Sequence, residues 1–161
     1  MPEYRVRVTK DYLVFSAGHF ITFNGNQCER LHGHNYGVEA EVRGSLDENQ
    51  YVIDFIALRD ALQKITIDLD HHMQLPTQHK MIKVTPDEKE VLVSFDDKRW
   101  IFPREDCVLL PIPNTTTELL AKYIGERLIE EIGSALTQNA TLIRIAVDEN
   151  NGQWGEWIES L

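Results

Sequence analysis

Runs of alternating apolar and polar residues mark the first quarter of the chain. Residues 4–8 alternate first, residues 13–19 resume the same period, and residues 36–42 repeat it. Because successive side chains of a strand point to opposite faces, each run predicts a strand with one buried face. The second strand either continues the first or follows a bend near Lys10 and Asp11. A loop is expected between the second and third runs, where Asn and Gly gather at residues 22–27.

Two longer stretches have the three-and-four spacing of a helix that buries one side. The first covers residues 55–69 and follows Asp54, a residue type that caps helix N-termini. The second covers residues 115–132, and its Thr115 and Glu118 match a capping box. We therefore predict two amphipathic helices that pack on a common sheet.

A charged segment between the two helices, residues 79–113, returns to strand periodicity. Residues 91–95 and 98–102 alternate on either side of a polar turn, which predicts an inserted β-hairpin. A loop is expected after it, through Cys107, which we interpret as structural. The many charges of this insertion favour a peripheral position.

The last part of the chain predicts a second hairpin. Residues 143–149 and 154–158 flank Asn151 and Gly152, a strong two-residue turn signal. The order of elements predicts an α+β fold: an antiparallel four-stranded sheet, two helices on one of its faces, and the inserted hairpin. At this length, residues 1–161 are expected to form a single domain.

Composition narrows the classes of function. The net charge of −10 argues against nucleic acid as a partner, because phosphate contacts need a basic surface. The sequence has no apolar run near the roughly 20 residues of a membrane helix and no signal-peptide pattern at its start. Two cysteines, Cys28 and Cys107, do not make a disulfide framework, so we expect a cytoplasmic protein.

A candidate metal site stands out at the end of the second run and the start of the third. His32 and His34 are two residues apart, so both imidazoles leave the same face of a strand, and His19 has the matching parity on its own run. Gly33 between them leaves room for an ion. Three neutral imidazoles with a vacant fourth position are typical of catalytic zinc. Taken singly, each is as well explained as an ordinary histidine.

Four features together resemble the 6-pyruvoyl-tetrahydropterin synthase family. They are a strand end at His19, Cys28 ahead of His32-Gly33-His34, the step Leu69-Asp70-His71, and Glu149 after an apolar strand. The likeness covers residues 4–76 and 113–160, nearly everything outside the insertion. The three residues between Cys28 and His32 match the short spacing of the queuosine-pathway branch, which makes 6-carboxytetrahydropterin.

The resemblance implies the T-fold, in which subunits join into trimeric barrels, usually stacked as a dimer of trimers, with active sites at subunit interfaces. It implies a zinc-dependent lyase acting on 7,8-dihydroneopterin triphosphate, a small-molecule pterin. The product of this branch is 6-carboxy-5,6,7,8-tetrahydropterin. Two other products stay open, 6-pyruvoyltetrahydropterin and the folate precursor 6-hydroxymethyldihydropterin. A further alternative is a pterin- or purine-binding module without catalysis.

The resemblance also assigns roles near the metal. His19, His32 and His34 match its zinc ligands, and Cys28 matches its general base. A related branch instead carries a catalytic glutamate, and here Glu29 directly follows the cysteine. Adjacent side chains point differently, so only one of the two is expected to reach the substrate in a given conformation.

The remaining family positions lie elsewhere in the chain. Asp70 and His71 match an acid/base pair in which the carboxylate orients the imidazole. His72 is an alternative to His71, and both residues are also explained by the end of the first helix. Glu149 matches the anchor of the pterin ring, and Thr116 and Thr117 match the rim of that pocket. The triphosphate contacts are left open among Lys10, Arg30 and Arg144.

Overall fold

The computed structural model describes residues 2–25 and 27–161. Met1 and Asn26 lie outside the described residues, and with them the first residue of the expected domain and one residue of the expected loop 22–27.

Seven strands of the described residues form the main sheet, in the order β10-β6-β2-β5-β11-β12, with β1 also paired to β5. The antiparallel part of this sheet consists of β1 (Tyr4–Val8), β2 (Val14–His19), β5 (His32–Gly44), β11 (Ala140–Asp148) and β12 (Trp154–Ser160). They pair antiparallel, as the alternating runs predict. Strand β5 is the longest, and β2 pairs with its first half while β1 pairs with its second half. The break near Lys10 and Asp11 is therefore a bend between two strands on the same side of β5.

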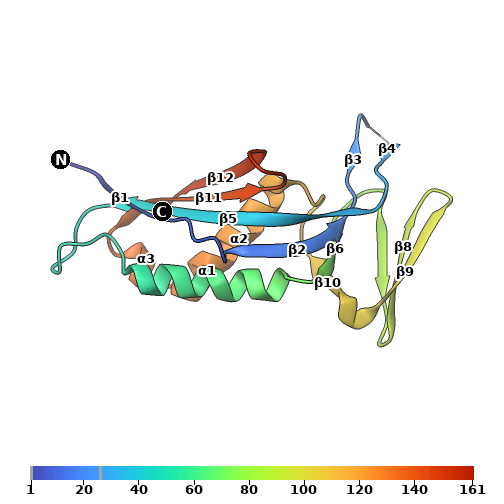
Figure 1. Cartoon of the computed structure of the whole chain (residues 1–161), viewed down its shortest axis with the longest axis horizontal. Helices are drawn as coiled ribbons and strands as arrows, with labels where there is room; N and C mark the ends of the chain where they lie inside the picture. Colours follow the sequence, from blue (N-terminus) through green and yellow to red (C-terminus); the bar gives the residue numbers. More distant parts are fainter. Residues whose placement is uncertain (1, 26) are drawn as a thin grey trace.

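Two long helices cover one face of this sheet (Figure 1). They are α1 (Phe55–Leu69) and α2 (Thr117–Ile132), and a short α3 (Ser134–Thr137) follows. Their apolar stripes are fully buried against the inward face of the sheet, at Leu58 and Leu62 of α1 and Leu120 of α2. Burial of such stripes is the main driving force that fixes the helices here. Asp54 caps α1 as predicted, because its carboxylate accepts a hydrogen bond from the Ile56 N–H.

The predicted capping box of α2 is wrong. The N-cap residue is Thr116, which makes no side-chain cap bond, and Glu118 accepts a hydrogen bond from the Thr117 hydroxyl instead. Thr115 is completely buried and its hydroxyl lies against His19 and the Phe20 carbonyl. The Thr115 hydroxyl therefore contacts His19 and Phe20 in the folded protein instead of capping the helix, as the local sequence pattern had predicted.

Two short strands extend the sheet where sequence periodicity predicted none. They are β6 (His72–Pro76) and β10 (Cys107–Leu110), and they pair in parallel with each other, while β6 pairs in parallel with β2. Most of β6 is buried, so its residues show no polar alternation. A buried strand of only five residues is too short to establish an alternation of apolar and polar residues. Such a strand therefore cannot be distinguished by its pattern from the end of a helix.

The insertion forms a small sheet of its own at one end of the molecule (Figure 1). Its strands are β7 (Lys83–Pro86), β8 (Glu90–Phe95) and β9 (Lys98–Pro103), followed by the 3-10 turn η1 (Arg104–Asp106). The β8–β9 hairpin was predicted and is confirmed, whereas β7 was not predicted. The inner side chains of the insertion pack on Phe20 and Met73 of the main body. Beside it lies a minimal hairpin, β3 (Thr22–Phe23) and β4 (Gln27–Cys28), within the expected loop.

Candidate metal centre and active site

Three histidines meet on the inward face of the main sheet, at one end of β2 and β5. His19 pairs with His32 in the strand register, and His34 lies two residues further along the same face. The ring centroids are 4.8 to 5.2 Å apart, and one ring nitrogen from each lies within 4.8 Å of the others. Gly33 allows β2 and β5 to lie close together, since a Cβ at this position would stand 2.9 Å from the Ala17 carbonyl oxygen. The sequence spacing thus predicts the cluster correctly.

Backbone acceptors fix how two of the rings present their nitrogens. His19 Nδ1 lies 3.0 Å from the Thr115 carbonyl oxygen, and His32 Nδ1 lies 2.7 Å from that of Arg30. A carbonyl only accepts, so each Nδ1 carries the proton and each Nε2 keeps its lone pair. This is how proteins orient imidazole ligands of a metal.

The free nitrogens fit a divalent cation. The Nε2 atoms of His19 and His34 are buried and have no hydrogen-bond partner among the described residues. Buried polar atoms of this kind are costly unless a ligand satisfies them. Burial lowers the pKa of His19 to about 4, so the ring is neutral and able to coordinate at physiological pH. The cluster is therefore a three-imidazole site that can hold a metal.

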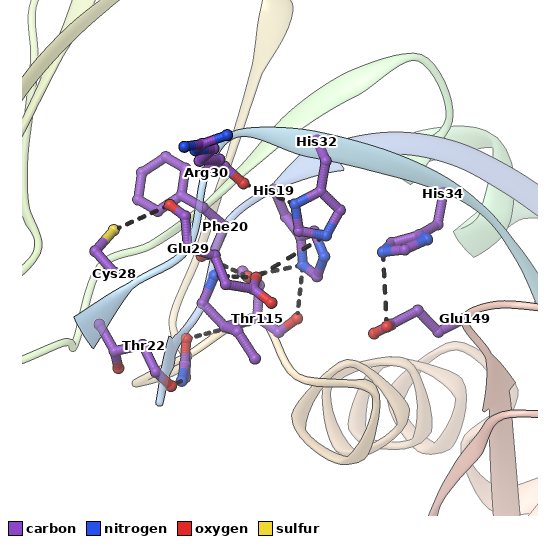
Figure 2. Close-up of polar contacts among 12 residues, drawn as sticks. His19, Phe20, Thr22, Cys28, Glu29, Arg30, His32, His34, Thr115 and Glu149 are labelled. Carbon is purple, nitrogen blue, oxygen red and sulfur yellow. Dashed lines mark hydrogen bonds and ion pairs between the residues drawn. The ribbon is translucent and has the colours of Figure 1, made fainter. Parts of the chain in front are cut away.

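Two carboxylates border the cluster from different elements (Figure 2). Glu149 follows β11, and its Oε1 lies 3.6 Å from His34 Nε2. Glu29 follows β4; its Oε2 accepts a hydrogen bond from the Ile21 N–H at 3.0 Å and lies 3.9 Å from His32 Nε2. The centre thus combines imidazole nitrogens with acid groups at its rim.

Cys28 points elsewhere. Figure 2 shows its sulfur on the far side of Glu29 from the three imidazoles, where Sγ lies 3.5 Å from the Glu29 carbonyl oxygen. The thiol packs against the apolar cluster of the insertion. Burial raises the pKa of Cys28 above its ordinary value, Lys98 opposes this shift, and Glu29 adds to it. As expected for adjacent residues, one of the two faces the metal centre in this conformation, and it is Glu29.

The sequence pair Asp70 and His71 is brought together at the start of β6. Asp70 Oδ2 lies 2.8 Å from His71 Nδ1, and Asp70 Oδ1 accepts a hydrogen bond from the Ser16 N–H at 2.7 Å. This N–H is the main reason why the pKa of Asp70 is lowered, and the contacts with His71 lower it further. Asp70 is the C-cap residue of α1, and the His71 N–H bonds to the Ser16 carbonyl. Asp70 thus holds the imidazole of His71.

A cavity of about 710 Å³ lies beside this pair, over β2 and β5. His71, His32 and His34 all line it, together with Ser16 and Asn35 of β2 and β5. The side chain of His71 is 82% exposed, so its free nitrogen is accessible. Asp70 pairs with His71 and not with His72, the alternative, whose Nδ1 is buried without a partner among the described residues.

The other expected site residues lie around the start of α2 and on the sheet. Thr116 is the N-cap residue of α2 and Thr117 is its first residue, and Thr117 lies so close to Gly155 of β12 that a Cβ there would overlap its side chain. Arg144, a candidate for phosphate binding, is paired with Glu156. Sequence reasoning missed the role of Thr115, which orients His19. Its only local signal was the capping pattern, which pointed to a different role.

Comparisons with known proteins agree with one another. The family described as 6-pyruvoyl tetrahydropterin synthase matches residues 7–159. A putative 6-carboxy-5,6,7,8-tetrahydropterin synthase of Methanocaldococcus jannaschii is 31% identical over 142 residues, which are 88% of this chain and 86% of that protein. The 6-carboxy-5,6,7,8-tetrahydropterin synthase of Aquifex aeolicus is 32% identical over 133 residues, 79% of this chain and 75% of the relative.

Solved structures extend the likeness to the whole chain. The 6-pyruvoyl tetrahydropterin synthase of Plasmodium falciparum superposes with a TM-score of 0.92 at 34% identity, over 99% of both chains. A Plasmodium vivax 6-pyruvoyltetrahydropterin synthase gives a TM-score of 0.93 at 31% identity over 100% of both chains. That structure is described as a catalytic residue mutant in which a glutamate is replaced by alanine. Among the described residues, no helix is long and apolar enough to cross a bilayer.

Proposed function

The chain belongs to the 6-pyruvoyl tetrahydropterin synthase family, and from this premise we propose a zinc-dependent lyase. Its substrate is 7,8-dihydroneopterin triphosphate and its product is 6-carboxy-5,6,7,8-tetrahydropterin. The T-fold expected from the sequence is the fold of its structural relatives. The observation that carries the proposal is the three-imidazole cluster with acid groups at its rim. The product is chosen because the curated relatives carry that name.

His19, His32 and His34 would hold the zinc ion. Bound zinc supplies a Lewis acid that makes the side-chain hydroxyls of the substrate and the adjacent C–H more acidic. Three protein ligands leave a coordination position for the substrate, whereas a structural zinc takes four protein ligands. The Thr115 and Arg30 carbonyls keep two of the rings in the coordinating tautomer.

Proton transfer is assigned to Cys28 and to the Asp70–His71 pair. Cys28 is assigned as the general base, in thiolate form, on the protons of the substrate side chain. In the structure its sulfur is turned away from the centre, so this role requires β4 to rotate or the substrate to reach past Glu29. His71, held through Nδ1 by Asp70, exchanges a proton at its exposed Nε2.

Glu149 would anchor the pterin ring. A carboxylate accepts two hydrogen bonds from the ring's amino group and adjacent N–H, and Glu149 stands beside His34 where such a ring would adjoin the metal. Thr116 and Thr117 would form the rim of this pocket.

We further propose that the working enzyme is a homo-oligomer, a trimer or a dimer of trimers, in the reducing cytoplasm. Among the described strands, β12 pairs only with β11 and β1 pairs only with β5, so each leaves a backbone edge to be covered. Both cysteines are free thiols, and a free Cys28 is compatible with a reducing compartment.

Product analysis tests the proposed reaction. Purified protein is incubated with 7,8-dihydroneopterin triphosphate and the pterins are identified by mass spectrometry. The expected result is 6-carboxy-5,6,7,8-tetrahydropterin as the main product. A chain that yields only 6-pyruvoyltetrahydropterin, or that binds the substrate and leaves it unchanged, contradicts the proposal.

A second activity, formation of 6-hydroxymethyldihydropterin, is favoured by the placement of Glu29. Its carboxylate faces the imidazole cluster, and the Plasmodium vivax relative is described as having a catalytic glutamate. We expect Glu29→Gln to lower the rate of formation of 6-hydroxymethyldihydropterin by about a hundredfold or more, because an amide cannot act as the base. The carboxylated product is expected to persist. Loss of both products to the same degree, by mass spectrometry, contradicts separate roles for Glu29 and Cys28.

A further inference from the structure

The hairpin that carries Cys28 is tethered through Thr22. Thr22 lies directly opposite Cys28 in the β3–β4 register. Its hydroxyl oxygen lies 2.8 Å from Nε2 of His79, at the start of the insertion, and its carbonyl oxygen accepts a hydrogen bond from the Asn114 amide at 3.3 Å. Two residues far along the chain thus hold the strand that pairs with the thiol.

The direction of the His79 contact is determined by the other ring nitrogen. Nδ1 of His79 lies 2.9 Å from both the Met81 and the Ile82 backbone nitrogens, and these N–H groups can only donate. Nδ1 must therefore carry a lone pair, and the ring proton sits on Nε2 and is donated to the Thr22 hydroxyl. Burial lowers the pKa of His79, and nearby Lys83 lowers it further, which keeps the ring neutral.

Packing supports the same hairpin from the insertion side. The Trp100 ring of β9 stacks on Phe20, two residues before Thr22, with centroids 4.5 Å apart and planes 19° from parallel. Cys28 itself packs against the apolar cluster of the insertion. The insertion thus contacts the hairpin through one directional hydrogen bond and one apolar surface.

We propose that the insertion acts as a positioning support for the Cys28 hairpin, and that His79 is its positioning residue, acting through Thr22. The hydrogen bond from His79 fixes the strand opposite the thiol and thereby sets how far Cys28 is exposed and where it stands. This inference depends on the proposed function in one respect only, namely that the Cys28 thiol has a catalytic role. The geometric claim, that His79 and Thr22 control the thiol, is independent of any substrate.

Two substitutions remove the tether from either side. Thr22→Val keeps the shape of the side chain and removes the hydroxyl. His79→Asn keeps an acceptor near the Nδ1 position for Met81 and Ile82 and removes the donor that reaches Thr22. Thr22→Ser restores a hydroxyl. Thr77→Val is the matched control, because it removes a threonine hydroxyl bonded to the Leu110 carbonyl at 3.0 Å, a bond that involves neither Thr22 nor His79.

The measurement is the alkylation rate of Cys28 by iodoacetamide in the full-length, zinc-loaded protein, followed by peptide mass spectrometry. We expect Thr22→Val and His79→Asn each to raise the rate about fivefold, as loss of one hydrogen bond allows. The double variant should be no faster than either single, since both remove the same bond. Thr22→Ser and Thr77→Val should match the parent.

Several results overturn the proposal. One is a Cys28 rate within about twofold of the parent in both single variants, which is below the effect of a typical hydrogen bond. Another is a double variant whose Cys28 alkylation rate rises by the product of the two single increases, because Thr22 and His79 would then act separately. A third is an equal rise at Cys107, which is buried in the insertion cluster and reports on general opening. If alkylation changes as expected while no pterin is converted, the positioning stands and the proposed reaction fails.

Discussion

Replacing His32 with alanine is expected to remove the metal and to lower turnover by about a thousandfold or more, since both Lewis-acid activation and substrate orientation are lost. His32 is the central ligand of the predicted trio, paired with His19 across the strands and 4.8 Å in ring centroid from both other histidines. Two remaining imidazoles do not make a stable zinc site. Zinc is measured by atomic emission spectrometry after dialysis, and turnover by product formation.

The control for this variant is His72→Ala. His72 lies nearby on β6 but is outside the three-imidazole cluster, so its variant should keep the metal. If His32→Ala keeps zinc with the affinity of the parent protein, the assignment of the ligands is wrong. If both variants lose zinc equally, the cluster is not specific.

Replacing Cys28 with alanine is expected to lower formation of the carboxylated product by about a thousandfold, within the range of a lost general base. Zinc content and pterin binding should be unchanged. Among the described residues, the Cys28 sulfur makes no hydrogen bond to the three histidines or to Glu149. The loss should therefore appear in kcat, with KM near that of the parent protein.

Cys107→Ala serves as the comparison for Cys28→Ala. Cys107 is the other free thiol; it is buried in the cluster of the insertion, and its sulfur bonds to the Pro103 carbonyl. Its variant should turn over substrate at the parent rate. Full formation of the carboxylated product by Cys28→Ala removes this residue from the mechanism and leaves Glu29 as the base.

The elements that sequence patterns predicted are those that bury one face and expose the other. Strands β2 and β5 and helices α1 and α2 each show a clear period, and each was placed correctly to within a few residues. Strands β6 and β10 were missed because they are short and none of their residues is exposed, which removes the alternation on which the prediction depends. The β3–β4 hairpin was missed because two residues per strand carry no period at all.

The candidate site was predictable to the extent that it follows strand parity. Parity places His32, His34 and His19 on one face, which the structure bears out as a cluster. It could not predict which of Cys28 and Glu29 faces that cluster, because this depends on how the insertion packs against the hairpin. Nor could it predict the carbonyl of Thr115 as the acceptor for His19, which requires residues 96 apart in sequence to meet.

The most direct test of the central claim is a zinc titration of the metal-stripped protein, with product formation measured at each addition. Turnover should be absent at first, rise in proportion to added zinc, and stop rising at one ion per chain, with the His32→Ala variant inactive throughout. Stripped protein that turns over 7,8-dihydroneopterin triphosphate at the full rate, verified free of metal, contradicts it.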